Sequence, residues 1–256
     1  MTGDMDLNAD LGESFGAWRL GDDEALVEHI TSANLACGFH AGDFRVMEAT
    51  VALCRRAEVA VGAQPGYPDL LGFGRRPMLF EPDDVESLVR YQIGALEAFC
   101  RAQGVEMQHV KPHGALYNQA ATDVALASAI ARAVAKFSRG LALFGLASSE
   151  PMASAASDAG LRFVPEAFAD RRYMPDGTLQ PRGEPGSVIT DAAAAAAQAV
   201  AIAEGRGVTA VDGSGVALHA ESICCHGDTP GAVAIAAAVR SGLESASIRV
   251  TAVSDR

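Results

Sequence analysis

Titratable side chains follow a short apolar run in residues 35–43, whose sequence is LACGFHAGD. A buried strand explains the apolar half, but packing a core does not require His40, Gly42 and Asp43 together. Gly38 and Gly42 indicate a close backbone approach or a positive φ. A histidine near a carboxylate can be a general base, an oriented metal ligand or a hydrogen-bonded interior residue. We therefore take His40 as the foremost catalytic candidate, and Asp43 as a substrate-binding candidate that is equally well placed to cap the following helix.

A second polar group lies at the first apolar segment, in residues 6–13 (DLNADLGE). Side chains alternate along a strand, so Asn8 and Asp10 are expected to point to the same side, into the mouth of a barrel. Asp10 is a catalytic candidate there, and Asn8 and Glu13 are substrate-binding candidates. The alternative is that Asp10 begins a turn and that Glu13 is solvated.

Lys111 and His113 flank Pro112 after another strand-like segment. Because proline restricts the local backbone, this spacing lets both side chains address one pocket. Lysine there supplies a fixed positive charge for an anionic substrate or a developing oxyanion. Both residues are catalytic candidates; the structural alternative is a lysine whose stem lies along apolar surface and a loop histidine.

Two long irregular segments, 64–80 and 170–186, are rich in Gly, Pro and Arg. Loops of this length in a compact domain are often functional, so both are candidate lids or partner surfaces. Arg75, beside two glycines, is a candidate for clamping a carboxylate or phosphate, with a solvated hairpin as the alternative. Asp170 and Arg171 are substrate-binding candidates because they follow a strand, although the two could simply pair with each other.

Strand-like and helix-like segments alternate along most of the chain, and this order must bring the polar groups together. Short apolar strands in a βαβα rhythm predict a mostly parallel sheet. The chain has seven or eight such units and no glycine-rich phosphate fingerprint. This favours a (β/α) barrel with seven strands rather than an open doubly wound sheet. We expect residues 1–256 to form this barrel as a single α/β domain. The expected strands are 5–9, 32–37, 59–63, 107–111, 141–146, 162–166, 208–211 and 221–225. The expected helices are 22–31, 43–57, 82–103, 122–138, 149–159, 190–204 and 229–241.

Composition indicates an ordinary globular protein. The chain has 256 residues, of which 49% are hydrophobic and 20% charged, so it is long enough to bury a large core. Its net charge of −12 argues against nucleic acid or an anionic membrane as the main partner, because both require basic surface. No apolar run reaches membrane-spanning length and no basic-then-apolar leader is present, so cytoplasmic residence is the expectation.

Several familiar signatures are absent from the sequence. The five cysteines lack CxxC spacing, so neither a disulfide framework nor a zinc ribbon is indicated. Cys54 and Cys100 fall in helix-like segments and suit apolar packing. The chain contains no P-loop, no nucleophile-elbow motif and no HExxH, which leaves nucleotide-loop, serine-hydrolase and zincin interpretations without support.

The ordered motifs together resemble the LamB/YcsF family over about residues 5–250. The segments that carry the resemblance are 6–13 (DLNADLGE), 33–43 (ANLACGFHAGD), 72–76 (GFGRR), 110–118 (VKPHGALYN), 168–171 (FADR) and 226–228 (HGD). Several long motifs in one order are far more specific than a single short pattern. The resemblance implies a (β/α)7-type barrel related to the glycoside hydrolase and polysaccharide deacetylase group.

The same resemblance implies ATP-dependent opening of the lactam 5-oxo-L-proline to L-glutamate, by a 5-oxoprolinase in which this chain is the A subunit and works with partner subunits B and C. ATP is then a co-substrate handled mainly by the partner subunits, because this chain lacks a recognisable nucleotide loop. One departure is Gln64, since the family usually has histidine in Gly-Ala-His-Pro. Glutamine forms hydrogen bonds but does not titrate, so either Gln64 orients substrate or the activity is altered.

Three hypotheses follow for the chemistry. In the first, an activated lactam is opened with His40 or His113 as general base, oriented by Asp10 or Asp43, while Lys111 and an arginine hold the substrate carboxylate and the developing charge. In the second, Asp10, His40 and His113 resemble the Asp-His-His metal set of barrel deacetylases, and a divalent ion activates water. In the third, the chain is a non-catalytic scaffold that positions its partners.

Overall fold

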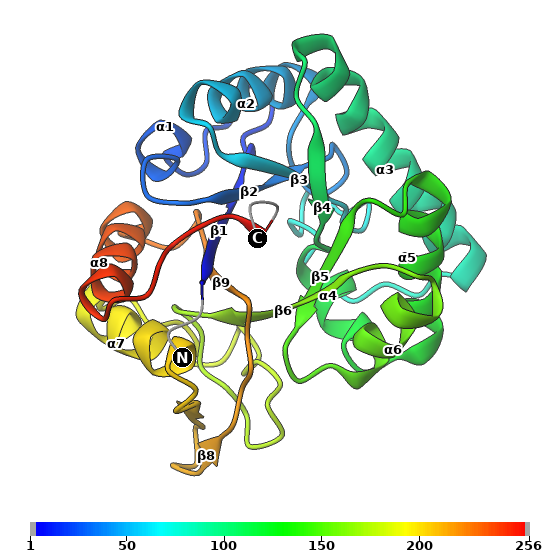
Figure 1. The fold of residues 1–256 in the computed structure, drawn as a ribbon. Helices are drawn as coiled ribbons and strands as arrows, with labels where there is room; N and C mark the ends of the chain where they lie inside the picture. The colour runs from blue at the N-terminus through cyan, green and yellow to red at the C-terminus, as the bar shows by residue number, and fades with distance from the viewer. Residues whose placement is uncertain (1–3, 254–256) are drawn as a thin grey trace.

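Seven parallel strands close into a barrel in the computed structural model, which describes residues 4–253 (Figure 1). The order around the barrel is β1-β2-β3-β4-β5-β6-β9, and pairing of β9 with β1 completes the closure. The expected seven-stranded (β/α) barrel is therefore confirmed. The barrel strands are β1 (Asp6–Leu11), β2 (Ser32–Ala36), β3 (Ala60–Gln64), β4 (Met107–Val110), β5 (Ala142–Leu146), β6 (Phe163–Phe168) and β9 (Ser222–Cys225).

Helices surround the strands on the outside of the barrel (Figure 1). Each long helix buries one face, as α2 does with Met47, Val51 and Cys54, whose spacing places them on one side of the helix. Cys54 and Cys100 are both buried in helices, as predicted. The helices are α1 (Asp23–Leu26), α2 (Phe44–Ala57), α3 (Pro82–Gln103), α4 (Gly114–Ala120), α5 (Val124–Phe137), α6 (Glu150–Asp158), α7 (Ala192–Ala203) and α8 (Ala232–Ser245).

Side-chain caps fix where several helices begin. Asp43 accepts hydrogen bonds from the backbone amides of Arg45 and Val46, which are free donors in the first turn of α2. Asp191 caps α7 in the same way. The α3 helix begins at Pro82, as its sequence predicts.

Alternation along β1 separates an apolar face from a polar one. Its odd-numbered residues belong to the hydrophobic core between strands and helices. Its even-numbered residues, Asp6, Asn8 and Asp10, are also buried, but they form hydrogen bonds with the neighbouring strands. The barrel interior beside β1 is therefore a polar network, and the larger apolar core lies outside the strands. A smaller apolar cluster that includes Phe144 packs against this network, since Phe144 stacks on His109.

Three sequence expectations about the elements are wrong. Segment 208–211 is not a barrel strand, because β7 (Val208–Thr209) pairs only with β8 (Gly215–Val216) in a small antiparallel sheet. The expected helix 22–31 is reduced to the single turn of α1. Helix α4 was not expected, yet it begins directly after His113 and so fixes the position of that side chain.

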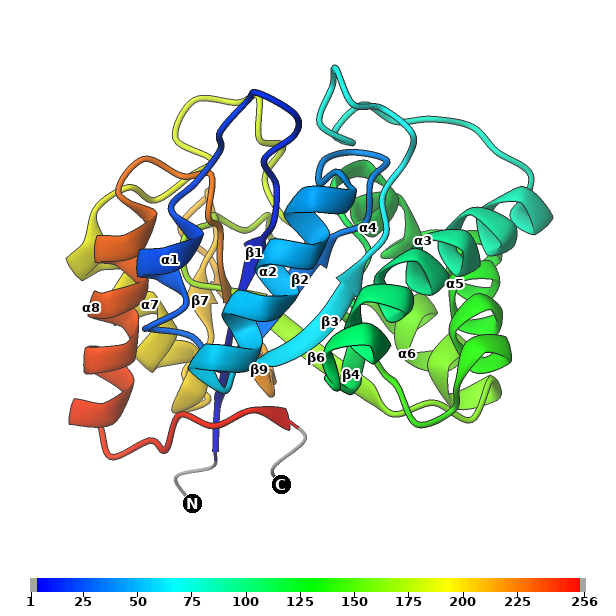
Figure 2. The same cartoon turned by 90° about the horizontal axis from the view of Figure 1, so that it is seen from above.

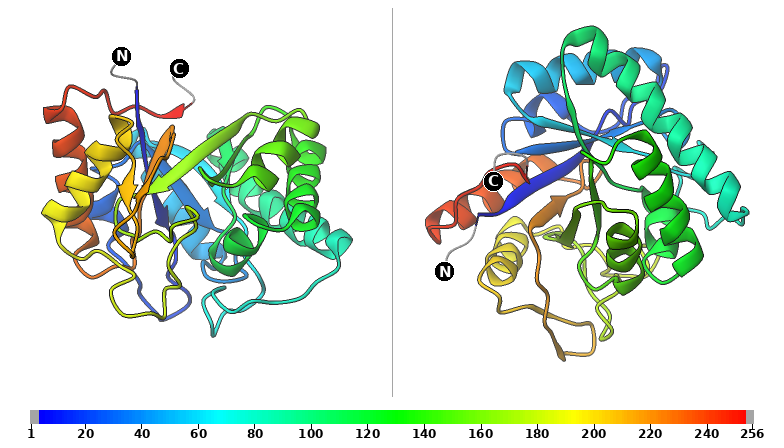
Figure 3. Two further views of the ribbon diagram at one scale, coloured as in Figure 1. Left: turned by 90° about the horizontal axis from the view of Figure 1, so that it is seen from below. Right: turned by 45° about the vertical axis from the view of Figure 1, so that its right-hand side comes forward.

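Long loops gather on one side of the barrel, at the carboxyl ends of the strands. The loops that follow β1, β3 and β6 extend to the same side, away from the two ends of the described chain (Figures 2 and 3). Candidate segments 64–80 and 170–186 form two of these loops. Chemistry-bearing residues that are far apart in the sequence therefore meet at one mouth, as in other (β/α) barrels.

None of the helices within residues 4–253 is both long and apolar enough to cross a bilayer.

Candidate active site

Lys111 is a buried cation at the centre of the barrel mouth, with only 3% of its side chain exposed. Its Nζ lies 3.1 Å from Oδ1 of Asp10 and 2.9 Å from Oε1 of Glu166. The same ammonium group donates to Oδ1 of Asn8 at 3.1 Å and lies 3.1 Å from Sγ of Cys224. Several different strands thus supply partners to one amine.

The groups around Lys111 are themselves held by hydrogen bonds. Asn34 donates to Oδ1 of Asn8 at 2.7 Å and to Oδ1 of Asp10 at 2.9 Å, and its own oxygen lies 2.7 Å from Nε2 of His109. The Tyr117 hydroxyl donates to Oε2 of Glu166 at 2.8 Å. Such a network fixes the Lys111 ammonium in position, because every displacement breaks several buried hydrogen bonds.

Charge pairing governs ionisation in this network. Burial alone raises the pKa of Asp10, but the nearby Lys111, together with His226 and His113, more than offsets this and holds that pKa well below its usual value. Burial lowers the pKa of Lys111, and the carboxylates of Asp10 and Glu166 and the thiol of Cys224 raise it above its ordinary value. At neutral pH the mouth therefore contains a charged lysine paired with a charged Asp10.

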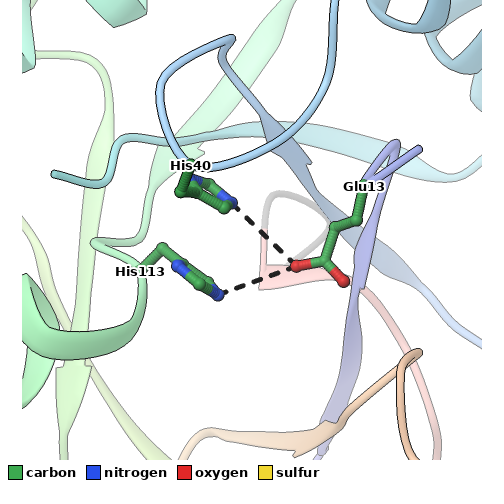
Figure 4. A group of neighbouring side chains, drawn as sticks. All are labelled: Glu13, His40 and His113. Atoms are coloured by element: carbon green, nitrogen blue, oxygen red, sulfur yellow. Dashed lines mark ion pairs between the residues drawn. The ribbon is translucent and has the colours of Figure 1, made fainter. Parts of the chain in front are cut away.

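A second group lies beside this pair and consists of Glu13, His40 and His113 (Figure 4). Nε2 of His113 is 3.7 Å from Oε1 of Glu13, and Nε2 of His40 is 4.0 Å from the same oxygen. The two imidazoles stack with ring centroids 3.8 Å apart and an interplanar angle of 9°. Gly74 makes this packing possible, since a Cβ on it would lie 2.7 Å from Cβ of His40.

Both histidines of this second cluster are neutral at neutral pH. Burial raises the pKa of Glu13 well above its ordinary value, and Asp10 and Asp228 raise it further. Burial lowers the pKa of His40 to about 4. Burial and the neighbouring His40 also lower the pKa of His113 well below its usual value. Two unprotonated imidazoles therefore lie beside the Lys111 pair.

A cavity of about 570 Å³ opens next to both clusters. Lys111, His113 and Gln64 belong to its lining. Its charged lining residues are mostly cationic, namely Arg75, Lys111, Arg171 and Arg182 against Asp10. A concave site with this charge balance suits an anionic small molecule.

Arginines from two loops define the outer part of the cavity. Arg75 and Arg182 approach the same carboxylate of Asp228, at 2.7 Å and 3.5 Å. Arg171 is buried and donates to the backbone oxygens of Gln180 and Ser187. Burial and the neighbouring Arg182 lower its pKa to about 10. Arg76, in contrast, is 66% exposed and pairs with Asp69.

Several predicted residues occupy places different from those expected. Asp43 does not line the cavity, since its carboxylate caps α2 and also accepts a 2.6 Å hydrogen bond from Gly16 N. The carboxylate that faces both histidines is that of Glu13, which takes the place expected for Asp10 or Asp43. In the group of residues that could hold a metal ion, Glu13 likewise stands where Asp10 was expected, and the role of each residue in the reaction stays a prediction.

Asp170 and Arg171 do not pair with each other. Asp170 accepts a hydrogen bond from Nδ1 of His226 at 2.9 Å and one from the Thr229 hydroxyl at 3.2 Å. Arg171 instead holds the backbone of its own loop. The two residues thus position His226 and the 170–186 loop, and both Arg171 and His226 line the cavity.

The remaining predicted residues lie where the barrel geometry places them. Asn8 and Asp10 point into the barrel, as expected from strand alternation. Gly38 and Gly42 both have positive φ, at 94° and 74°. Gln64 is buried at the end of β3, beside the His40 ring, and its amide atoms have no hydrogen-bond partner within residues 4–253.

Glu166, His109 and His226 belong to the site but were not among the predicted site residues. Glu166 lies within β6 and points into the barrel, where it meets Lys111. His109 lies within β4 and supports Asn34. Glu166 is a polar residue inside an otherwise apolar strand, and this pattern could have indicated a site residue. His226 belongs to the HGD motif that follows the last barrel strand.

The chain is similar to known proteins along nearly its whole length. The chain is 54% identical over 249 residues to the A subunit of 5-oxoprolinase from Methylococcus capsulatus, covering 97% of this chain and 95% of that protein. It is 51% identical over 252 residues to the A subunit of 5-oxoprolinase from Bacillus subtilis, covering 98% of each. The crystal structure of the lactam utilization protein from Thermus thermophilus matches with a TM-score of 0.91 and 48% identity, over 97% of this chain and 99% of that one.

A more distant structure shares the fold alone. A putative cellobiose-phosphate cleavage protein from Enterococcus faecalis matches over 98% of this chain and 97% of its own, with a TM-score of 0.56 at 14% identity. The family model for LamB/YcsF matches residues 5–256, and the relatives above match nearly their full length. The chain belongs to the LamB/YcsF family.

Proposed function

We propose that this protein is the A subunit of an ATP-dependent 5-oxoprolinase, which opens the lactam ring of 5-oxo-L-proline to L-glutamate together with partner subunits B and C. The observation that carries the proposal is the full-length identity of about half to proteins named as the A subunit of 5-oxoprolinase. The cationic cavity at the barrel mouth supports it, because the substrate and the product are both carboxylates.

Binding of the substrate is assigned to the arginine side of the cavity. 5-Oxo-L-proline carries one carboxylate, which Arg75 or Arg182 can hold through paired N–H donors. Both arginines already approach the Asp228 carboxylate. The ring amide then points inward, toward Lys111 and His113, and Gln64 is placed to orient it by hydrogen bonds.

The chemistry must overcome the poor electrophilicity of an amide. ATP phosphorylates the amide oxygen, a step that we assign to the partner subunits. Water then adds to the activated carbon and gives a proton to neutral His113, the ring C–N bond breaks, and the nitrogen takes a proton to become the amine. A second water hydrolyses the resulting acyl phosphate to L-glutamate and phosphate. Lys111 stabilises the negative charge that develops on oxygen.

The proposal is tested by measuring glutamate release from 5-oxo-L-proline with this chain alone, and with subunits B and C and ATP added. We expect release in the complete mixture and background release when the chain or ATP is omitted. Background release in the complete mixture, while the A subunit from Bacillus subtilis is active with its own partners, refutes the proposal.

Adjacent arginines offer a matched pair of variants. Arg75→Gln removes a guanidinium that lines the cavity, whereas Arg76→Gln removes one that faces solvent. We expect Arg75→Gln to raise KM for 5-oxo-L-proline by roughly tenfold or more, as lost charge-assisted hydrogen bonds predict. Arg76→Gln is expected to leave KM unchanged. Equal effects of the two substitutions would contradict the assigned position of the substrate carboxylate.

A further inference from the structure

Glu13, His40 and His113 offer one ligand atom each to a common point in the barrel mouth. The three ligand atoms all lie within 4.8 Å of one another (Figure 4). They come from the loop after β1, the loop after β2 and the residue that precedes α4, so three separate elements hold them in place. All three side chains are buried.

Four buried polar atoms of this cluster have no hydrogen-bond partner among the residues that the structure describes. This holds for Oε1 of Glu13, for both ring nitrogens of His40 and for Nδ1 of His113. Buried polar atoms are nearly always satisfied, because leaving one unpaired is costly. The separations of 3.7 Å and 4.0 Å from Glu13 to the two histidines are too long for hydrogen bonds. The cluster is therefore built for a further group.

The donor set indicates what that group is. Two neutral imidazole nitrogens and one carboxylate oxygen are ligands for a divalent ion such as Zn²⁺, Co²⁺, Mn²⁺ or Fe²⁺. Bonds of about 2.1 Å in a tetrahedral arrangement place ligand atoms roughly 3.4 Å apart. The observed 3.7 Å and 4.0 Å exceed this spacing by about 0.3 Å and about 0.6 Å, so the ligand atoms need to move by less than about 1 Å to close on an ion.

We propose that Glu13, His40 and His113 bind one divalent transition-metal ion, through Oε1 of Glu13 and Nε2 of each histidine. Three protein ligands leave a coordination position for water or substrate, as is typical of catalytic rather than structural zinc sites. His113 lines the cavity, so this position is reached from the substrate side. With an ion bound, His113 would hold the metal and would not act as the general base, and the ion would instead supply the activation of water. Binding of the metal stands by itself, and only its importance for turnover rests on the proposed function.

The site is tested by metal binding to the intact chain, which carries no polyhistidine tag. Metal-free protein is titrated with Co²⁺ and with Zn²⁺, and binding is followed by calorimetry and by the visible absorption of Co²⁺. We expect one ion per chain, a tetrahedral or five-coordinate Co²⁺ spectrum, and a Tm that rises with metal concentration.

Variants locate the ion. Glu13→Gln, His40→Gln and His113→Gln are each expected to weaken Co²⁺ binding by about tenfold or more and to change the Co²⁺ spectrum. His219→Gln is the matched control, because His219 is exposed and lies outside the cluster. Circular dichroism melts show which variants fold. If a histidine variant does not fold, Glu13→Gln is used for the test, because it keeps the shape of the side chain.

Two results overturn the proposal. One is the absence of stoichiometric binding of either ion to the folded protein, and the other is binding by the cluster variants as tight as that of the control. The outcomes also separate the site from the function. Stoichiometric metal binding without glutamate release supports the metal site and refutes the proposed function. Glutamate release by a protein that binds no metal supports the proposed function and refutes the metal site.

Discussion

Replacing Lys111 by methionine removes a cation that the buried carboxylates of Asp10 and Glu166 share. Methionine keeps most of the apolar stem and lacks the ammonium group, so the substitution isolates the charge. The chain contains one other lysine, Lys136. Lys136 also pairs with a carboxylate, that of Glu86, but 57% of its side chain is exposed. Lys136→Met is therefore the matched control.

The two substitutions are expected to differ strongly in cost. Breaking a buried ion pair from one side costs about 3–5 kcal/mol, because it leaves an uncompensated buried charge. Lys111 has two carboxylate neighbours, at 3.1 Å and 2.9 Å, which places its loss near the upper end of that range. Exposed pairs contribute only about 0–1 kcal/mol, so Lys136→Met is expected to be nearly neutral.

Urea unfolding measures both effects, with the midpoint and the slope compared among variants. Neutralising the carboxylates as well, in the triple variant Lys111→Met, Asp10→Asn, Glu166→Gln, is expected to recover about half of the lost stability. A loss for Lys111→Met no larger than that for Lys136→Met would refute the view that a buried charge network holds the barrel mouth. A triple variant less stable than the single one would refute it equally.

Three further predictions concern the elements that support the site. The folded-state pKa of His109 is about 3 because the ring is buried and lies near Lys111, and an ordinary histidine has a pKa near 6.5. Between these two pH values only the unfolded state binds the proton, so the free energy of unfolding decreases as pH falls below 6.5, by up to about 1.4 kcal/mol per pH unit. In urea unfolding, His109→Gln should make this pH dependence less steep. A Cβ on Gly62 would overlap the His109 ring, whereas a Cβ on Gly94 would have nothing within 4 Å. In thermal unfolding, Gly62→Ala should therefore lower the stability by about 1–3 kcal/mol, and Gly94→Ala should not lower it. Asp43→Ala should cost about 1 kcal/mol through loss of the α2 cap, and an unchanged Tm would contradict that role.

Much of the site could be predicted because it lies at strand ends. His40, Lys111 and His113 follow apolar runs directly, and a parallel barrel brings all such positions to one mouth. Glu166 and His109 could not be placed in the same way, because they lie within strands and meet their partners across the barrel, between residues more than fifty positions apart.

The identity of the carboxylate that faces the histidines was also beyond the sequence. Asp10 is on β1 and is engaged by Asn34 and Lys111, whereas Glu13 lies beyond the strand end, where the loop turns back over the histidines. The path of that loop depends on packing between residues that are far apart in the sequence, which a local sequence pattern does not predict. The same limit applies to segment 208–211, whose apolar character resembles a barrel strand but whose chain turns back at once to form a hairpin with β8.

We propose that the residues at this barrel mouth carry out the ring opening. This proposal is tested most directly by glutamate formation from 5-oxo-L-proline in assemblies that contain the wild-type chain or the His113→Gln variant, with subunits B and C and ATP. Size-exclusion chromatography first confirms that both chains assemble equally. We expect the variant to assemble and its kcat to fall by about a hundredfold or more, as for loss of a general base. Full ATP-coupled turnover by an assembled His113→Gln variant would contradict it.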